Sequence, residues 1–201
     1  SLRPNAFTID HLRILKAIGV KAGSTIHNAL IHEAIGKSAE TDGLTGLPNA
    51  QALATRLEQE SARASRLRQP FSLFVVDLNG LKEINDTCGH LIGNKVLKAV
   101  GGALRKCLRE SDFVARMGGD EFVLLLPGMN TEDAAEKRLD LALAVAALHR
   151  EFPELEISIS MGSASYPADS QDAEQLMALA DRRMYWHKRE HYRSRAIGLE
   201  V

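Results

Sequence analysis

The hydrophobic and polar positions of this chain follow two periods, one typical of helices and one typical of strands. Apolar residues at three- and four-residue steps predict helices over about 7–38, 50–67, 90–108, 131–150 and 172–189. Short apolar or alternating runs predict strands at Phe71–Val76, Phe113–Arg116, Glu121–Leu126, Ile157–Ser165 and Ala196–Leu199. Paired strands among long helices indicate an α+β domain whose central sheet is largely antiparallel and flanked by helices.

Turn-forming residues mark the predicted connections. Residues 41–49 are rich in Thr, Gly, Pro and Asn, so we expect a loop before the helix that begins near residue 50. Gly118 and Gly119 separate two short strands and predict a hairpin. Thr131 stands where it can cap the helix that follows it.

The composition is that of an ordinary soluble protein with a packed core. Of the 201 residues, 45% are hydrophobic and 25% are charged, which suits one domain plus an appendage. A net charge of -1 gives no reason to expect a nucleic-acid polymer as partner. The apolar runs are too short to span a bilayer and no signal peptide is visible, so we expect no membrane contact by these 201 residues. Because Ser stands first instead of Met, we expect a piece of a longer protein.

The two cysteines carry no recognisable metal or redox motif. Cys88 is expected in a loop and Cys107 in a helix, and neither belongs to a Cys-x-x-Cys pair. Zinc binding is therefore not expected. Free thiols suit a reducing compartment, so we expect the protein in the cytoplasm.

Acidic residues stand at two places where strands end. Asp77 follows a buried strand, while Asp120 and Glu121 lie on the predicted hairpin turn. If these strands are neighbours in the sheet, the carboxylates converge and offer oxygen ligands that suit Mg²⁺ together with substrate phosphates. Such ions activate an attacking hydroxyl and neutralise phosphate charge. The alternative is a tight hairpin that uses glycines only for positive φ and leaves its acids in solvent.

Three separated motifs give the chain a resemblance to a known family. They are Asp-Gly-Leu-Thr-Gly-Leu-Pro-Asn at 42–49, Asp77–Asp86 followed by Gly89, His90 and Gly93, and Arg-Met-Gly-Gly-Asp-Glu-Phe at 116–122. With these motifs, residues 40–201 resemble a GGDEF domain, the family of diguanylate cyclases. The resemblance implies a palm-like nucleotidyl cyclase fold over 40–201, preceded by a separate helical segment over 1–39.

The resemblance implies a metal site and a catalytic role for the same acids. Asp77, the backbone carbonyl of Leu78, and Asp120 would hold two Mg²⁺ ions, with Mn²⁺ as a possible substitute. Glu121 would support the metals or help to deprotonate the attacking 3′-hydroxyl. Each domain would bind one GTP, and two facing domains of a homodimer would form cyclic di-GMP and pyrophosphate.

The resemblance also implies a substrate site. Backbone amides would cradle the triphosphate at Asn79, Gly80, Leu81 and Lys82, where Gly80 permits close approach. Asn85 would read the base edge, unless Asn85 and Asp86 are simply a turn pair or helix stop. Lys188 would meet the terminal phosphates, although a solvated lysine is the plain alternative.

Two positions depart from the family pattern. Asn94 stands where the family usually has Asp, and an amide pairs less well than a carboxylate with the two donors of guanine. Reduced preference for GTP, use of ATP and some cyclic GMP-AMP are one expectation, and retained GTP preference with the amide oxygen turned to the base is the other. The phosphate-binding Arg of the family falls on Tyr192, and Arg193 is the candidate to replace it.

Two further features concern regulation. Arg109 and Asp112 match the Arg-x-x-Asp motif through which cyclic di-GMP, the product, inhibits members of the family, although a surface ion pair has the same spacing. Asp42 is expected to pair with Arg116 and fix the hairpin. Residues 7–38 resemble the last helix of a GAF module and are expected either to pair two chains as a coiled coil or to pack on their own domain. A degenerate domain that binds nucleotide without turnover remains the rival interpretation.

Overall fold

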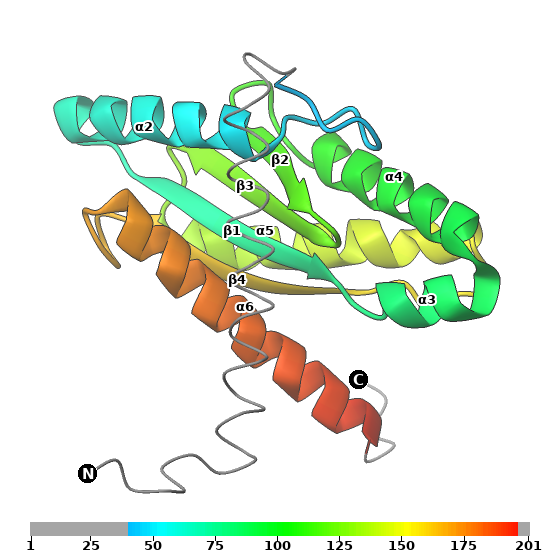
Figure 1. The fold of residues 1–201 in the computed structure, drawn as a ribbon. Coiled ribbons are helices and arrows are strands. Elements are labelled where there is room, and N and C mark those ends of the chain that lie inside the picture. Colours follow the sequence, from blue (N-terminus) through cyan, green and yellow to red (C-terminus); the bar gives the residue numbers. More distant parts are fainter. Residues whose placement is uncertain (1–39, 197–201) are drawn as a thin grey trace, which may run out of the picture. The chain divides into compact units, whose positions relative to one another are not determined.

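The structure is a computed structural model that describes residues 40–196, and Figure 1 shows their fold. Its helices are α2 (Ala50–Leu67), α3 (Leu81–Cys88), α4 (His90–Lys106), α5 (Thr131–Ala146), a 3₁₀ turn (Ala147–Arg150) and α6 (Ala173–Ala196). Its strands are β1 (Phe71–Leu78), β2 (Phe113–Gly118), β3 (Glu121–Pro127) and β4 (Ile159–Tyr166). The predicted helix over 7–38 and residues 197–199 of the predicted last strand lie outside the described residues.

The strands form one sheet in the order β2-β3-β1-β4, in which every neighbouring pair is antiparallel. The central strand β1 places Asp77 opposite Glu121 of β3 and opposite Ser160 of β4. The predicted antiparallel sheet and the hairpin between β2 and β3 are thus confirmed.

Helices cover both faces of this sheet, because the side chains of β1 alternate between two cores. The core shared with α3, α4 and α5 contains, from β1, Phe74, Val76 and Leu78. The core shared with α2 and α6 contains, from β1, Phe71, Leu73 and Val75. Figure 1 shows α6 on the near side of the sheet and α5 on its far side. By this alternation, Asp77 belongs to the face covered by α2 and α6.

A glycine on the edge strand lets α6 lie directly on the sheet. A Cβ atom at Gly162 of β4 would come within 2.1 Å of the Ala180 carbonyl oxygen and 2.2 Å of the Met184 amide nitrogen. Only glycine fits there, because the obstructing atoms are helix backbone. The close contact sets the path of α6 across β4 toward β1, and it carries Lys188 to the end of β1.

The sequence prediction misses helix α3 and wrongly places Cys88 in a loop. The structure puts Asn85 inside α3, and Cys88 is its last residue. Ile84 is the one buried residue of this short helix, so α3 has no apolar period for the sequence to reveal. Cys107 was expected within a helix but lies just after α4.

Several element ends also differ from prediction. Asn130, not Thr131, caps α5, because its side-chain oxygen accepts the amide hydrogen of Asp133 at 2.9 Å. Strand β4 begins two residues later than expected, at Ile159. Helix α6 does not end near 189 but extends to Ala196, which was predicted in a strand. None of the helices in residues 40–196 combines the length and the apolar character that a membrane crossing needs.

Candidate active site

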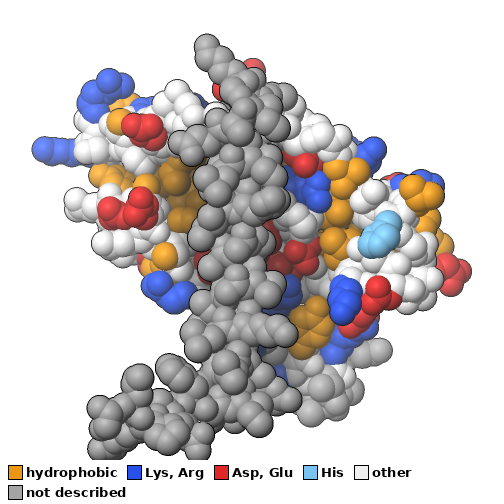
Figure 2. Space-filling view, viewed as in Figure 1, with side chains coloured by type: hydrophobic (Ala, Val, Ile, Leu, Met, Phe, Trp, Pro, Cys, Tyr) orange, Lys and Arg blue, Asp and Glu red, His pale blue; other side chains and the backbone are white. Residues whose placement is uncertain are grey.

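Strand pairing brings the three predicted acids together at one end of the sheet. Asp77 lies directly opposite Glu121, and opposite residues of an antiparallel pair project to the same face. The amide of Leu78 donates to the carbonyl oxygen of Asp120 at 3.0 Å, so the hairpin turn begins beside Asp77. On the face shown in Figure 2, acidic and basic side chains lie side by side near the region where β1 ends in Figure 1.

Asp77 is buried next to these acids, and this makes its charge costly. The residue is 3% exposed. Burial, opposed by the hydrogen bond from Lys188 and reinforced by the negative charges of Asp120 and Glu121, raises the pKa of Asp77 to about 6. Any cation near this carboxylate therefore relieves an unfavourable interaction.

Lys188 supplies that positive charge. Its Nζ donates to Asp77 Oδ2 at 2.8 Å and lies 2.7 Å from Oδ1. Burial lowers the pKa of Lys188, but Asp77 and then Asp120 outweigh it and raise the pKa above 10.5. The contact with Oδ1 is an ion pair without hydrogen-bond geometry, so Oδ1 remains a buried acceptor with no hydrogen bond. Oδ1 is therefore the Asp77 oxygen whose hydrogen-bonding capacity the described residues leave unsatisfied.

The available ligands suit a Mg²⁺ ion that is shared with the substrate better than an ion held by protein side chains alone. Within residues 40–196, no three side chains of His, Cys, Asp or Glu are gathered closely enough to hold an ion by themselves. Mg²⁺ typically takes one or two carboxylates and completes its shell with water and substrate phosphates. Asp77, Asp120 and the carbonyl group of Leu78 offer ligands of this type, and the buried Oδ1 atom of Asp77, which accepts no hydrogen bond, fits the role.

Arg116 fixes the turn that carries Asp120 and Glu121. Its guanidinium donates to both oxygens of Asp42 at 2.9 and 3.1 Å, and to the carbonyl oxygen of Gly119 at 2.6 and 3.2 Å. The turn needs glycine, because Gly119 has a φ of 56°. The predicted pairing of Asp42 with Arg116 is confirmed.

The start of α3 offers backbone amides beside the acids. Gly80 caps α3 with a φ of 70° and without a side-chain cap, so the first-turn amides of Leu81 and Lys82 have no partner within the helix. The amide of Asn79, by contrast, donates to the carbonyl oxygen of Ser158 at 2.9 Å and faces into the protein. Phosphate binding at this turn stays a prediction for Gly80, Leu81 and Lys82. The amides of Asn79 and Gly80 already donate, to Ser158 and to the hydroxyl oxygen of Tyr192, whereas those of Leu81 and Lys82 have no helical partner.

Both residues predicted to read the base lie where α3 meets α4. A Cβ atom at Gly93 would fall 2.0 Å from Asn85 Oδ1, so the side chain of Asn85 lies directly on Gly93. Asn94 follows Gly93 and is exposed. The structure thus brings Asn85 and Asn94 to the same junction, and their contact with a base remains a prediction.

The C-terminal part of α6 places Arg195, and not the predicted Arg193, on the same face as Lys188. Lys188, Tyr192 and Arg195 share one face of the helix at steps of four and three residues. The hydroxyl oxygen of Tyr192 accepts the Gly80 amide at 3.3 Å, and Arg195 lies 3.7 Å from Glu83 of α3.

Arg193 lies elsewhere on α6. Its side chain is 76% exposed and lies 4.0 Å from Glu190, so this placement does not support the predicted phosphate role. Sequence analysis missed Arg195 because it ended the helix at 189. Continuing the helical period from Lys188 identifies it.

The Arg109–Asp112 turn lies at the far end of β2 from the hairpin, about 20 Å away at 3.3 Å per strand residue. Asp112 is buried, and its Oδ2 accepts the backbone amide of Arg109 at 2.9 Å. Within residues 40–196 the guanidinium of Arg109 forms no ion pair. The surface ion pair is therefore not what the structure shows, and the exposed Arg109 is open to a ligand.

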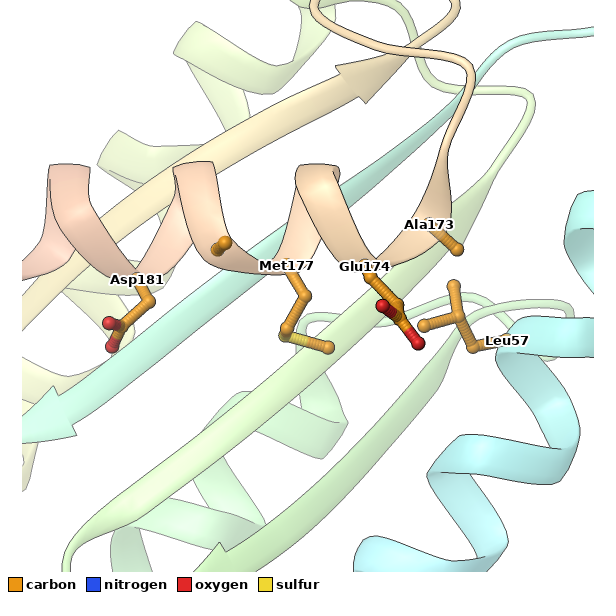
Figure 3. A pocket seen from close by; sticks show the side chains of 6 residues that line it. Leu57, Ala173, Glu174, Met177 and Asp181 are labelled. Carbon is orange, nitrogen blue, oxygen red and sulfur yellow. The ribbon is translucent and has the colours of Figure 1, made fainter.

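A separate hollow of about 440 Å³ lies between α2 and α6, away from the acids. Figure 3 shows Leu57 of α2 facing Ala173, Glu174 and Met177 of α6 across it. Its lining is mostly apolar and lacks the convergent polar groups of a nucleotide site, so we assign the chemistry to the acidic cluster.

Comparison with known proteins agrees with this geometry. The family described as "Diguanylate cyclase, GGDEF domain" matches residues 39–194. Diguanylate cyclase DgcP of Pseudomonas aeruginosa is 44% identical over 155 residues, which are 76% of this chain and 23% of that protein. Diguanylate cyclase DgcS of Shewanella oneidensis is 34% identical over 161 residues, which are 80% of this chain and 53% of that protein. The chain thus spans about a quarter of the first relative and about half of the second.

Solved structures show the same fold. The GGDEF domain of DgcB from Caulobacter crescentus, in complex with c-di-GMP, has a TM-score of 0.69 and 30% identity, covering 78% of this chain and 94% of that one. Diguanylate cyclase SiaD of Pseudomonas aeruginosa, in complex with its activator SiaC, has a TM-score of 0.69 and 29% identity, covering 90% of this chain and 70% of that one.

Proposed function

Because the chain belongs to the GGDEF domain family, we propose that it is a diguanylate cyclase domain that joins two GTP molecules into cyclic di-GMP. The observation that supports this most is the pairing of Asp77 with Glu121, which sets the turn bearing Asp120 beside a buried carboxylate. Named relatives with the same activity add to it. Mg²⁺ or Mn²⁺, when bound through Asp77, Leu78 and Asp120, would neutralise phosphate charge.

Different residues of this chain bind the phosphates and the base of GTP. The first-turn amides of α3 at Leu81 and Lys82 point their donors at a phosphate, and Gly80 allows its close approach. Lys188 exchanges its contact with Asp77 for the terminal phosphates when the substrate enters. Asn85 and Asn94 hold the base at the junction of α3 and α4.

The reaction needs two such sites. The 3′-oxygen of each GTP attacks the α-phosphorus of the other, the bond from α-phosphorus to the bridging oxygen breaks, and pyrophosphate leaves. The proton of the 3′-hydroxyl passes to Glu121 or to water. Facing domains are required, so we propose a homodimer, with residues 1–39 as the pairing segment and 40–201 as the catalytic domain. Deleting 1–39 is then expected to lower both dimer content and specific activity in sedimentation and turnover assays.

Product inhibition is proposed at the Arg109–Asp112 turn. Arginine binds phosphate or the Hoogsteen edge of guanine through two hydrogen bonds, and Arg109 is exposed and unpaired within the described residues. Arg109→Ala is expected to remove inhibition by added cyclic di-GMP while leaving the initial rate. An unchanged inhibition curve contradicts this assignment.

One incubation tests the main proposal. The protein is mixed with GTP and Mg²⁺, with or without ATP, and products are resolved by mass, with Asp120→Asn as the inactive control. Cyclic di-GMP formed by the wild type alone supports the proposal. Hybrid cyclic GMP-AMP in the mixed reaction reveals relaxed specificity at Asn94, and bound GTP without product favours the rival, a nucleotide-binding signalling domain that has lost turnover.

A further inference from the structure

A second pocket lies on the opposite side of α6 from the acidic cluster. It has a volume of about 270 Å³ and is lined by Arg138 of α5, Met161 of β4, and Arg182, Arg183, Trp186 and His187 of α6. Trp186 and Lys188 are two residues apart, which is about 200° around a helix. A ligand in this pocket therefore does not touch the face of α6 that meets Asp77.

Two of the three arginines that line this pocket carry an uncompensated charge. Within the described part of the chain, neither Arg138 nor Arg182 forms an ion pair. Arg183 differs, because its guanidinium is held by Asp169 at 2.8 Å and by the carbonyl oxygen of Ser163 at 2.7 Å. No acidic residue lines the pocket, so two guanidinium groups are free to bind an anion.

His187 adds a third hydrogen-bond donor. Its Nδ1 accepts the amide hydrogen of Met161 at 3.3 Å, and Met161 belongs to the edge strand β4. Burial, then the positive charge of Arg138, and then His191 lower the pKa of His187, so the ring is neutral at pH 7. With Nδ1 accepting, the proton must stand on Nε2. The ring therefore presents a donor and not a lone pair.

Trp186 gives the pocket a flat apolar surface. It is the chain's one tryptophan, and it is 65% exposed. A planar ring left in solvent beside cationic groups is a typical platform on which a base stacks. The donors and the ring together match a ligand that has both a phosphate and an aromatic base.

We propose that this pocket binds a nucleoside phosphate, with its phosphate on Arg138 and Arg182 and its base against Trp186. The site is separate from the proposed catalytic site. It is also separate from the Arg109–Asp112 turn, which supplies none of the residues that line the pocket. Binding here would couple to the active site through α6, which carries both Trp186 and Lys188.

The fluorescence of Trp186 tests the proposal directly, because no other tryptophan contributes to the signal. The full chain with Arg109→Ala, which silences the inhibitory turn, is titrated in EDTA with GMP, guanosine or pyrophosphate. Equilibrium dialysis of labelled GMP provides a second readout. We expect a saturable response to GMP, with guanosine and pyrophosphate each at least about tenfold weaker, because each makes only half of the contacts.

Variants separate this pocket from the active site. Arg138→Gln is expected to weaken GMP binding about tenfold or more, whereas Arg66→Gln, an exposed arginine on α2, serves as the matched control and leaves it unchanged. Loss of the response in Asp77→Asn places the signal at the active site and overturns the proposal. Equal binding of guanosine or pyrophosphate, or no saturable binding by either method, overturns it as well. A failed cyclase assay does not affect this test, because no turnover is needed.

Discussion

Replacing Asp77 with Asn is expected to stabilise the fold while removing activity. Burial and the neighbouring acids raise the pKa of Asp77 from 3.8 to about 6. At about 1.4 kcal/mol for each pH unit, this shift corresponds to roughly 3 kcal/mol of unfavourable charging in metal-free buffer. The value already includes the favourable contact with Lys188. The asparagine side chain carries no charge, so the Asp77→Asn variant avoids this cost and keeps a similar shape.

The sign and the pH window follow from proton binding. Between pH 3.8 and about 6 the native state holds the Asp77 proton more tightly than the unfolded state does, so the free energy of unfolding of the wild type falls as the pH rises. Above pH 6 the full cost is present, and below 3.8 it is absent. Asp77→Asn should therefore be more stable than wild type by up to about 3 kcal/mol at pH 8, with little difference near pH 4.

Urea denaturation in EDTA at several pH values measures this difference. Asp42→Asn is the matched control with the opposite sign. Burial raises the pKa of Asp42, but hydrogen bonds from Thr45 and then the contact with Arg116 lower it further, so the net shift is below 3.8. That variant should be less stable than wild type at neutral pH, and its deficit should shrink as the pH falls below 3.8. Parallel stability curves for wild type and Asp77→Asn, or a variant less stable than wild type at pH 8, would refute the reasoning.

Three further changes test other parts of the structure. Gly162→Ala should lower the free energy of unfolding by about 3 kcal/mol or more, because the new Cβ meets the backbone of α6. Gly102→Ala should not lower it, because a Cβ atom there has open space around it, and urea denaturation compares the two variants. Arg116→Gln should lower the cyclase rate at least tenfold at saturating GTP, because the Gly119 carbonyl loses its donors and the acidic turn loosens; an unchanged rate contradicts this. Asn94→Asp should raise the GTP-over-ATP preference about tenfold in competition assays, and an unchanged ratio shows that position 94 does not read the base.

Local patterns were enough to predict much of this protein. The alternating and continuous apolar runs predicted all four described strands. This is possible because the faces of a strand that become buried are visible as apolar positions in its own sequence. The motifs around Asp77 and Asp120 indicated both the family and the acidic cluster. Helix α3 and the last turns of α6 were missed, because their exposed residues show no apolar period that distinguishes helix from loop.

What the sequence determined by itself is therefore most of the elements, the family and the candidate acids. Only the tertiary structure decided which groups meet: Lys188 reaches Asp77 across 111 positions because Gly162 lets α6 lie on β4. It also decided that Tyr192 and Arg195, and not Arg193, share the face of Lys188. The physical reason is that contacts between distant residues depend on strand order and on how closely a helix approaches the sheet, and neither is encoded in a local period.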